Sequence, residues 1–191
     1  MRHAAPAIAL LAFCALFSAP ARAEIDPLTR QPLLMEAEGF KPQATAIPRE
    51  IVTYNSRYTP GTVLVDTRER RLYFVLPNNQ AVRYGVGVGR PGFEWSGVKP
   101  VTRKAEWPSW TPPSQMLKRR PDLPRFMPGG PENPMGARAL YLGSSLYRIH
   151  GSNEPETIGQ AVSSGCIRMV NEDVIDLYER VRVGARVVVL R

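Results

Sequence analysis

Apolar residues in the middle of the chain fall into three short runs separated by turn-forming residues. The runs over 71–76 and 81–88 are rich in β-branched and aromatic residues, and the run over 62–67 alternates weakly between apolar and polar positions. Runs of this length and composition predict β-strands. The segments between them, 68–70 and 77–80, are typical of a turn and a hairpin loop. The pattern therefore predicts an antiparallel meander.

The C-terminal third returns to strand patterns and adds one helix. Runs over 139–142 and 146–149 predict two strands. Asn171 precedes two acidic residues, which is typical of a helix N-cap and first turn. The apolar residues that follow at helical spacing are Val174, Leu177, Tyr178 and Val181. They predict a core-facing helix that ends at Gly184, before a closing strand over 186–190.

Residues 90–137 have a different composition. Ten of the 19 prolines lie between Pro91 and Pro134, together with Trp107 and Trp110. A loop of this length in a compact domain is usually functional or disordered. The fixed φ angles of the prolines and the two aromatic side chains favour an ordered, functional lid. Simple packing of the tryptophans onto the sheet is the alternative. The whole pattern predicts a mainly β fold with one or two short helices and a long proline-rich active-site loop.

The first 23 residues have the features of a secretion signal. A short basic start, an apolar stretch over 4–19 and the small-x-small sequence Ala21-Arg22-Ala23 predict cleavage before Glu24. The apolar stretch is shorter than the roughly 20 residues that span a bilayer, which disfavours a stable membrane anchor. We therefore expect an exported protein of the periplasm or cell envelope.

The predicted domain organisation follows from this signal. Phe13 occupies the position where a lipidated cysteine requires a small residue, so we expect Cys14 to leave with the signal peptide, 1–23. Residues 24–50 contain four prolines with little periodicity and predict an extended N-terminal arm. Residues 51–191 then form the predicted catalytic domain.

The net charge of the exported chain limits the classes of molecule that it is expected to bind. The predicted mature chain keeps 168 residues, enough for one domain with a real core. Arg2 and Arg22 leave with the signal and no acidic residue does, so the net charge falls from +8 to +6. A basic exported protein is attracted to anionic lipid headgroups or cell-wall polymers. Export and the lack of a nucleic-acid motif disfavour nucleic acid as a partner.

The predicted mature chain holds one cysteine and one histidine. Cys166 lies 16 residues after His150. A single cysteine forms no internal disulfide, and a free thiol in an oxidising compartment is exposed to oxidation, which disfavours a purely structural role. A thiol needs a base or a nearby positive charge to become the attacking thiolate. The pair therefore predicts a cysteine-nucleophile enzyme in which the histidine takes the thiol proton or stores it as an ion pair.

Glycines adjoin both residues. Gly151 follows His150 and Gly165 precedes Cys166, which lets the backbone approach a substrate closely. Backbone N–H groups at Gly165 and Cys166 are suited to hold the negative charge that develops on an attacked carbonyl oxygen. No acidic residue lies near His150 in sequence, so we expect a backbone carbonyl to orient the imidazole. Arg168 is suited to bind a substrate carboxylate, or to brace the loop. The residues alone indicate an acyl-transfer enzyme of the cell envelope.

These residues belong to a longer composite motif. It reads His150-Gly151-Ser152-Asn153, Ile158-Gly159, Ser163-Ser164-Gly165-Cys166-Ile167-Arg168-Met169 and Asn171-Glu172-Asp173. In sequence and spacing it resembles the L,D-transpeptidase catalytic domain, also called the YkuD domain, over about 51–190. The resemblance implies a β-sheet-rich sandwich or barrel that uses no cofactor and no metal.

The resemblance also implies a reaction. Cys166 would be the nucleophile and His150 the base, acting on the stem tetrapeptide of peptidoglycan. The bond before the terminal D-alanine would be cleaved through a thioester, and the acyl group would pass to an amine of another stem, giving a 3–3 cross-link, or of an envelope protein. The motif residues implied in substrate binding are Arg168, Ser163, Ser164 and Asn153, with Gly165 and Gly151 at the oxyanion.

Two departures from the family pattern leave the acceptor and the rate open. Ser164 stands where the family usually has histidine, and 97–102 is only a loose version of its Thr-Pro-Thr-Gly segment.

A cell-wall amide hydrolase on the same scaffold, with water as the acceptor, is the main alternative function. A non-enzymatic wall-binding domain is disfavoured by the Cys/His pair. A papain-like protease is disfavoured because its cysteine precedes its histidine.

Overall fold

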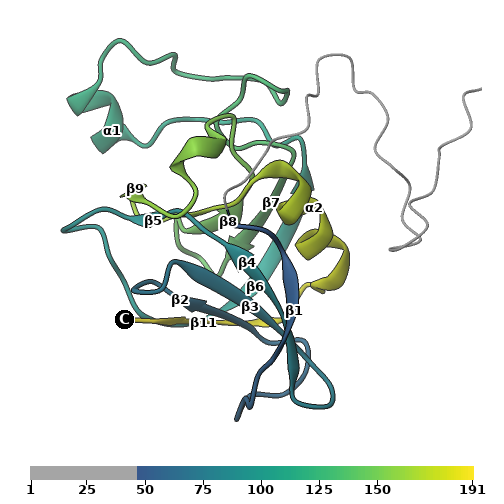
Figure 1. The fold of residues 1–191 in the computed structure, drawn as a ribbon. Coiled ribbons are helices and arrows are strands. Elements are labelled where there is room, and N and C mark those ends of the chain that lie inside the picture. The colour runs from purple at the N-terminus through teal and green to yellow at the C-terminus, as the bar shows by residue number, and fades with distance from the viewer. Residues whose placement is uncertain (1–46) are drawn as a thin grey trace, which may run out of the picture. The chain divides into compact units, whose positions relative to one another are not determined.

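The computed structural model describes residues 47–191 (Figure 1). The predicted signal peptide, 1–23, and the predicted arm, 24–50, as far as residue 46, lie outside the described residues. No helix within 47–191 is long and apolar enough to cross a membrane.

A nine-stranded sheet forms most of the described domain, in the order β1-β4-β3-β2-β11-β6-β7-β8-β10. Its strands are β1 (Glu50–Thr53), β2 (Val63–Asp66), β3 (Arg71–Leu76), β4 (Gln80–Gly85), β6 (Gly97–Glu106), β7 (Arg138–Leu142), β8 (Arg148–His150), β10 (Ile167–Arg168) and β11 (Arg186–Leu190). A second sheet pairs β5 (Val88–Gly89) with β9 (Ala161–Ser163). The helices are α1 (Ser114–Arg119), α2 (Asn171–Arg180) and a short 3-10 turn, Pro155–Thr157. The predicted mainly β class is confirmed.

The predicted meander is present as β2, β3 and β4, which pair antiparallel in sequence order. Asn78 and Asn79 connect β3 to β4 with positive φ angles of 59° and 54°. Asparagine tolerates this left-handed region better than most residues, which explains the sharp reversal at this position. The third predicted run ends earlier than expected, because β4 stops at Gly85 and Val88 starts β5.

Strand β6 connects two parts of the sheet that enclose the core. Its first half pairs with β11 and its second half with β7, with a register shift between Val101 and Arg103. Such an irregularity bends a strand and increases its twist, and the sheet curls over on itself (Figure 1). The core between the curled parts and α2 includes five side chains with no solvent exposure, Leu72, Tyr84, Leu140, Ile149 and Leu177.

The prediction of one long loop over 90–137 is wrong for its first part. Residues Gly97–Glu106 form β6, and Val101 is its only fully buried residue. A strand with one solvated face and mostly polar residues lacks the apolar pattern on which strand prediction depends, and Pro100 weakened the signal further. Residues 107–137 contain only α1 and are otherwise irregular.

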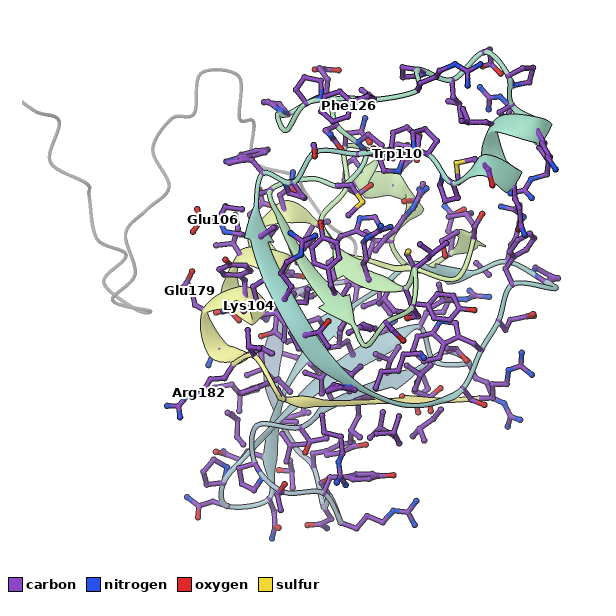
Figure 2. All side chains as sticks on the ribbon, turned by 180° about the vertical axis from the view of Figure 1, so that it is seen from behind. Lys104, Glu106, Trp110, Phe126, Glu179 and Arg182 are labelled. Atoms are coloured by element: carbon purple, nitrogen blue, oxygen red, sulfur yellow. The ribbon has the colours of Figure 1, made fainter. Side chains whose placement is uncertain are left out.

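Helix α2 also starts differently from the prediction. The N-cap position is Val170, and Asn171 is the first helical residue. The Asn171 side chain does not cap the helix; its Oδ1 accepts a hydrogen bond from the Ala137 N–H at 2.9 Å. At the other end, Lys104 of β6 donates to the carbonyls of Tyr178 and Val181, at 2.5 and 2.9 Å, which places a positive charge where a helix is electronegative (Figure 2).

Two aspartates of α2 are buried against Tyr84 and Arg49. Asp176 accepts hydrogen bonds from the Tyr84 hydroxyl at 2.5 Å and from Arg180, and Arg49 lies 3.4 Å away. Burial opposes ionisation of Asp176, but these partners lower its pKa on balance. Asp173 has only Arg49 at 3.8 Å, and its Oδ2 has no hydrogen-bond partner within the described part of the chain. Burial therefore raises the pKa of Asp173 to about 7.

Replacing Asp173 with asparagine should change the free energy of unfolding more favourably at pH 8 than at pH 4.5. The folded protein binds a proton at Asp173 up to about pH 7, whereas the unfolded chain releases it near pH 4. Stability from this group is therefore lost as the pH rises from about 4 to 7, and Asp173→Asn removes that loss. We expect a gain at pH 8 of about 3 kcal/mol over the value at pH 4.5, read from melting temperatures. Glu179→Gln, on the exposed side of the same helix (Figure 2), should show no such difference. Equal shifts at both pH values would contradict the assignment.

Candidate active site

Two short parallel strands bring His150 and Cys166 together. β8 and β10 place Ile149 beside Ile167 and His150 beside Arg168. Successive side chains of a strand point to opposite faces, so Ile149 and Ile167 face the core while His150 and Arg168 share the other face. Cys166 precedes β10 directly and lies two residues before Arg168, which puts its side chain on the same face.

Both side chains line one cavity of about 420 Å³. The segment 107–137 also contributes to its lining, with Trp110, Pro113 and Met135 from irregular parts and Met116 from α1. Trp110 lies on the part of this segment that passes over the sheet (Figure 2). The segment therefore lines the site, and Trp110 contributes to the cavity whereas Trp107 does not.

A backbone carbonyl orients the imidazole, as the sequence predicts. His150 is 5% exposed, and its Nδ1 lies 2.6 Å from the Gly151 carbonyl oxygen. A carbonyl oxygen only accepts hydrogen bonds, so Nδ1 carries the proton and Nε2 is left with the basic lone pair. Burial, followed by the charge of Arg168, lowers the pKa of His150 to about 4. The imidazole is therefore neutral at pH 7 and able to accept a proton.

The thiol is also neutral at rest. Cys166 is partly exposed, and its Sγ lies 3.7 Å from the Leu146 carbonyl oxygen. Burial raises the pKa of Cys166, and the backbone and guanidinium of Arg148 offset that effect only in part. A neutral thiol and a neutral imidazole that line the same cavity favour proton transfer during attack over a preformed ion pair.

The turn that carries the nucleophile is held by its own side chains. Ser163 donates to the Cys166 carbonyl at 2.6 Å and accepts from the Gly165 N–H at 3.0 Å. Gly165 has a φ of 103°, and a Cβ there would lie 2.6 Å from the Tyr147 ring. Only glycine fits this position, because both the backbone conformation and the close approach exclude a side chain.

Comparison with known proteins agrees with this geometry. A model of the YkuD family, the L,D-transpeptidase catalytic domain, matches residues 60–189. The chain belongs to this family. The probable L,D-transpeptidase ErfK/SrfK of Escherichia coli K12 is 42% identical over 168 residues, covering 81% of this chain and 52% of that protein. The probable L,D-transpeptidase YbiS of the same organism is 37% identical over 149 residues, covering 74% and 47%. This chain thus spans about half the length of these curated relatives.

Solved structures share the fold of this YkuD domain. An L,D-transpeptidase from Mycobacterium smegmatis superposes with a TM-score of 0.54 at 16% identity, covering 68% of this chain and 58% of that one. A Brucella melitensis protein, described as a probable carnitine operon oxidoreductase, has a TM-score of 0.52 at 43% identity, covering 77% and 96%. The family assignment rests on the family model and the curated relatives, which agree with each other.

Three residues predicted at the oxyanion or the substrate are engaged elsewhere in this YkuD domain. The N–H groups of Gly165 and Gly151 donate to Ser163 Oγ and to the Arg138 carbonyl, so neither is available for an oxyanion. Asn153 does not line the cavity; its Nδ2 donates to the Glu132 carbonyl at 3.0 Å. The two amides and the Asn153 side chain therefore hold backbone segments of the site together.

Three further predicted residues, Ser163, Ser164 and Arg168, line the cavity. Arg90 Nη1 lies 3.4 Å from the Ser164 hydroxyl. Arg168 Nη1 forms an ion pair with Glu154 at 2.8 Å. The Arg168 guanidinium is therefore partly neutralised, and the bracing role is the better description of it.

Two supporting residues carry no signal in the sequence. Trp95 donates from Nε1 to the Gly165 carbonyl at 2.7 Å and stacks on Tyr147 with ring centroids 4.5 Å apart. The hydrogen bond from Trp95 helps to hold the nucleophile turn in place. Trp95 lies in a segment without periodicity, so nothing in the sequence connects it to Gly165, 70 residues away.

Proposed function

We propose that this YkuD domain is a peptidoglycan L,D-transpeptidase with Cys166 as its nucleophile and His150 as its general base. The observation that carries the proposal is the single cavity that contains a partly exposed thiol and an imidazole held by the Gly151 carbonyl. The donor is a stem tetrapeptide, and the acceptor is an amine of a second stem or of an envelope protein. The basic charge of the chain is consistent with export to an anionic cell wall.

The first half of the reaction acylates the enzyme. The thiol proton moves to Nε2 of His150 while Sγ attacks the carbonyl before the terminal D-alanine. The amide C–N bond breaks, the proton passes from His150 to the departing amine, and a thioester remains on Cys166. Since the Gly165 N–H is already bonded to Ser163 Oγ, we assign the Cys166 N–H as the oxyanion donor of this turn.

The second half transfers the acyl group. An acceptor amine attacks the thioester carbonyl, a new C–N bond forms and the C–S bond breaks. The amine proton moves to His150 and then to the thiolate, which restores the resting pair. Water in place of the amine would give the hydrolase, so the class of enzyme depends on how well the lid segment excludes water.

The purified domain should exchange the terminal D-alanine of a stem tetrapeptide for an added D-amino acid. The apolar lid residues Trp110, Pro113 and Met116 favour an amine over water, so hydrolysed tripeptide should be the minor product. Mass spectrometry of defined muropeptides after incubation measures both products. A carbapenem should also acylate Cys166 and appear as a mass adduct on its peptide. Tripeptide alone, even at high amine concentration, would assign the hydrolase instead.

A further inference from the structure

Three side chains form a row across the sheet that leads to the nucleophile. Strand pairing places Arg103 of β6 beside Tyr141 of β7, and Tyr141 beside Arg148 of β8. The guanidinium carbon of Arg103 lies 3.6 Å from the centre of the Tyr141 ring, and that of Arg148 lies 5.3 Å from it. The pairing of β8 with β10 then puts Cys166 next to Arg148. Two guanidinium groups therefore lie close to one aromatic ring, and one of them, that of Arg148, belongs to the residue next to the nucleophile.

This row lines a second cavity of about 210 Å³. It is separate from the catalytic cavity but adjoins it, because Trp110, Met135 and Arg148 line both. A molecule in the second cavity would therefore approach Cys166 from the side of β6 and β7, while the catalytic cavity holds the acyl chain.

The two arginines have no acidic partner within residues 47–191. The ion pairs of that part of the chain involve other arginines, such as Arg168 with Glu154. Arg148 Nε is buried and has no hydrogen-bond partner among the described residues. A buried polar group without a partner is costly and is usually satisfied by a ligand or water. Stacking on Tyr141 restricts both guanidinium planes, and such planes bind carboxylates with paired hydrogen bonds.

We propose that this second cavity binds the acyl acceptor through its carboxylate, with Arg103 and Arg148 as the binding residues. The proposal rests on the transferase function above and specifies its acceptor as an amine that carries a carboxylate close by, as a free amino acid or a diamino acid of a stem does. With the carboxylate held at the arginines, the amine nitrogen reaches the thioester carbonyl. The C–N bond then forms, the C–S bond breaks, and His150 takes the amine proton.

The test compares D-methionine with D-methioninamide as acceptors, which differ in the carboxylate. For each enzyme, the ratio of kcat/KM for the acid to that for the amide is measured from exchange products by mass spectrometry. Arg103→Gln should lower this ratio roughly tenfold relative to the wild type, as expected for loss of a hydrogen bond between charged groups. Comparing the ratios between enzymes cancels the different basicities of the two amines.

A matched control is Arg57→Gln. Arg57 also lies over a tyrosine ring, with its guanidinium carbon 5.3 Å from the centre of Tyr58, but it lines neither cavity. Its acid-to-amide ratio should equal that of the wild type. Arg103→Lys should keep part of the preference, because the charge remains and the paired geometry is lost. An unchanged ratio in Arg103→Gln would overturn the acceptor site and leave the transferase function standing.

A binding measurement separates this inference from the proposed function. D-Methionine is titrated into Cys166→Ala, which has no nucleophile, and chemical-shift changes are followed by NMR with and without Arg103→Gln. Binding that weakens roughly tenfold with Arg103→Gln supports the carboxylate site even if the wild type forms no exchange product. Exchange by the wild type, with D-methionine binding that is insensitive to residue 103, would refute the site alone.

Discussion

Cys166→Ala should reduce acyl transfer by at least about 10³-fold, because it removes the atom that forms the thioester. The remaining cavity and the Cys166 backbone N–H would still bind the donor, so KM for the tetrapeptide should change far less than kcat. Initial rates of D-alanine exchange, measured by mass spectrometry, give both constants. The carbapenem adduct should disappear together with the exchange activity.

The fold should tolerate this substitution. Cys166 is partly exposed, and the turn around it is held by Ser163 and Trp95 and not by the sulfur. We expect a loss of stability on the order of 1 kcal/mol or less. Ser144→Ala, which removes one heavy atom from an exposed position outside the cavity, is the matched control and should keep wild-type rates. Substantial turnover by a folded Cys166→Ala enzyme would show that another residue carries the acyl group.

The parts of the fold that the sequence predicts are those with a local signal. The runs at 62–67 and 71–76 became β2 and β3 because each buries its apolar residues within a few positions. Strand β6 was not predicted because most of its side chains are polar and face solvent. Its place in the sheet is decided by its neighbours β11 and β7, and no property of residues 97–106 alone contains that information.

The same distinction applies to the site. The Cys/His pair and the orienting carbonyl follow from residue types and from the lack of an acid near His150, and the structure places a carbonyl at the imidazole. The partners of Ser163 and Asn153 depend on which backbone groups the fold brings within 3 Å of them. A motif lists residues without their hydrogen bonds, so it could not show that both side chains hold loops in place, Ser163 while also lining the cavity and Asn153 outside it.

Arg148 illustrates what a sequence pattern overlooks. It lies two residues before His150 on one strand and so shares the face of the site, yet it belongs to no part of the quoted motif. Arg103 is even more distant from the motif in sequence, and it lies on a strand that the sequence did not predict. Only the pairing of β6, β7 and β8 connects the two arginines through Tyr141.

His150→Gln should lower kcat by about 10²- to 10⁴-fold, since glutamine keeps a polar side chain but cannot take the thiol proton.

The pH dependence of the wild-type rate tests whether His150 is the base. His150 is active when neutral, so activity is retained above its pKa and lost as the pH falls through it. With that pKa lowered to about 4, the acid limb of kcat/KM for acylation should fall near pH 4, well below the 6.5 of an ordinary histidine.

Removing the charge of Arg168 gives a second test of His150 as the general base. Burial is the main reason for the low pKa of His150, and Arg168 is the next. Arg168→Gln removes a positive charge beside the imidazole, so protonation becomes easier and the acid limb should move to higher pH, while burial keeps it below the ordinary value. Carbapenem acylation followed from pH 3.5 to 8 measures the limb without an acceptor. An acid limb near pH 6.5 in the wild type, or one that does not move in Arg168→Gln, would contradict His150 as a buried, neutral base.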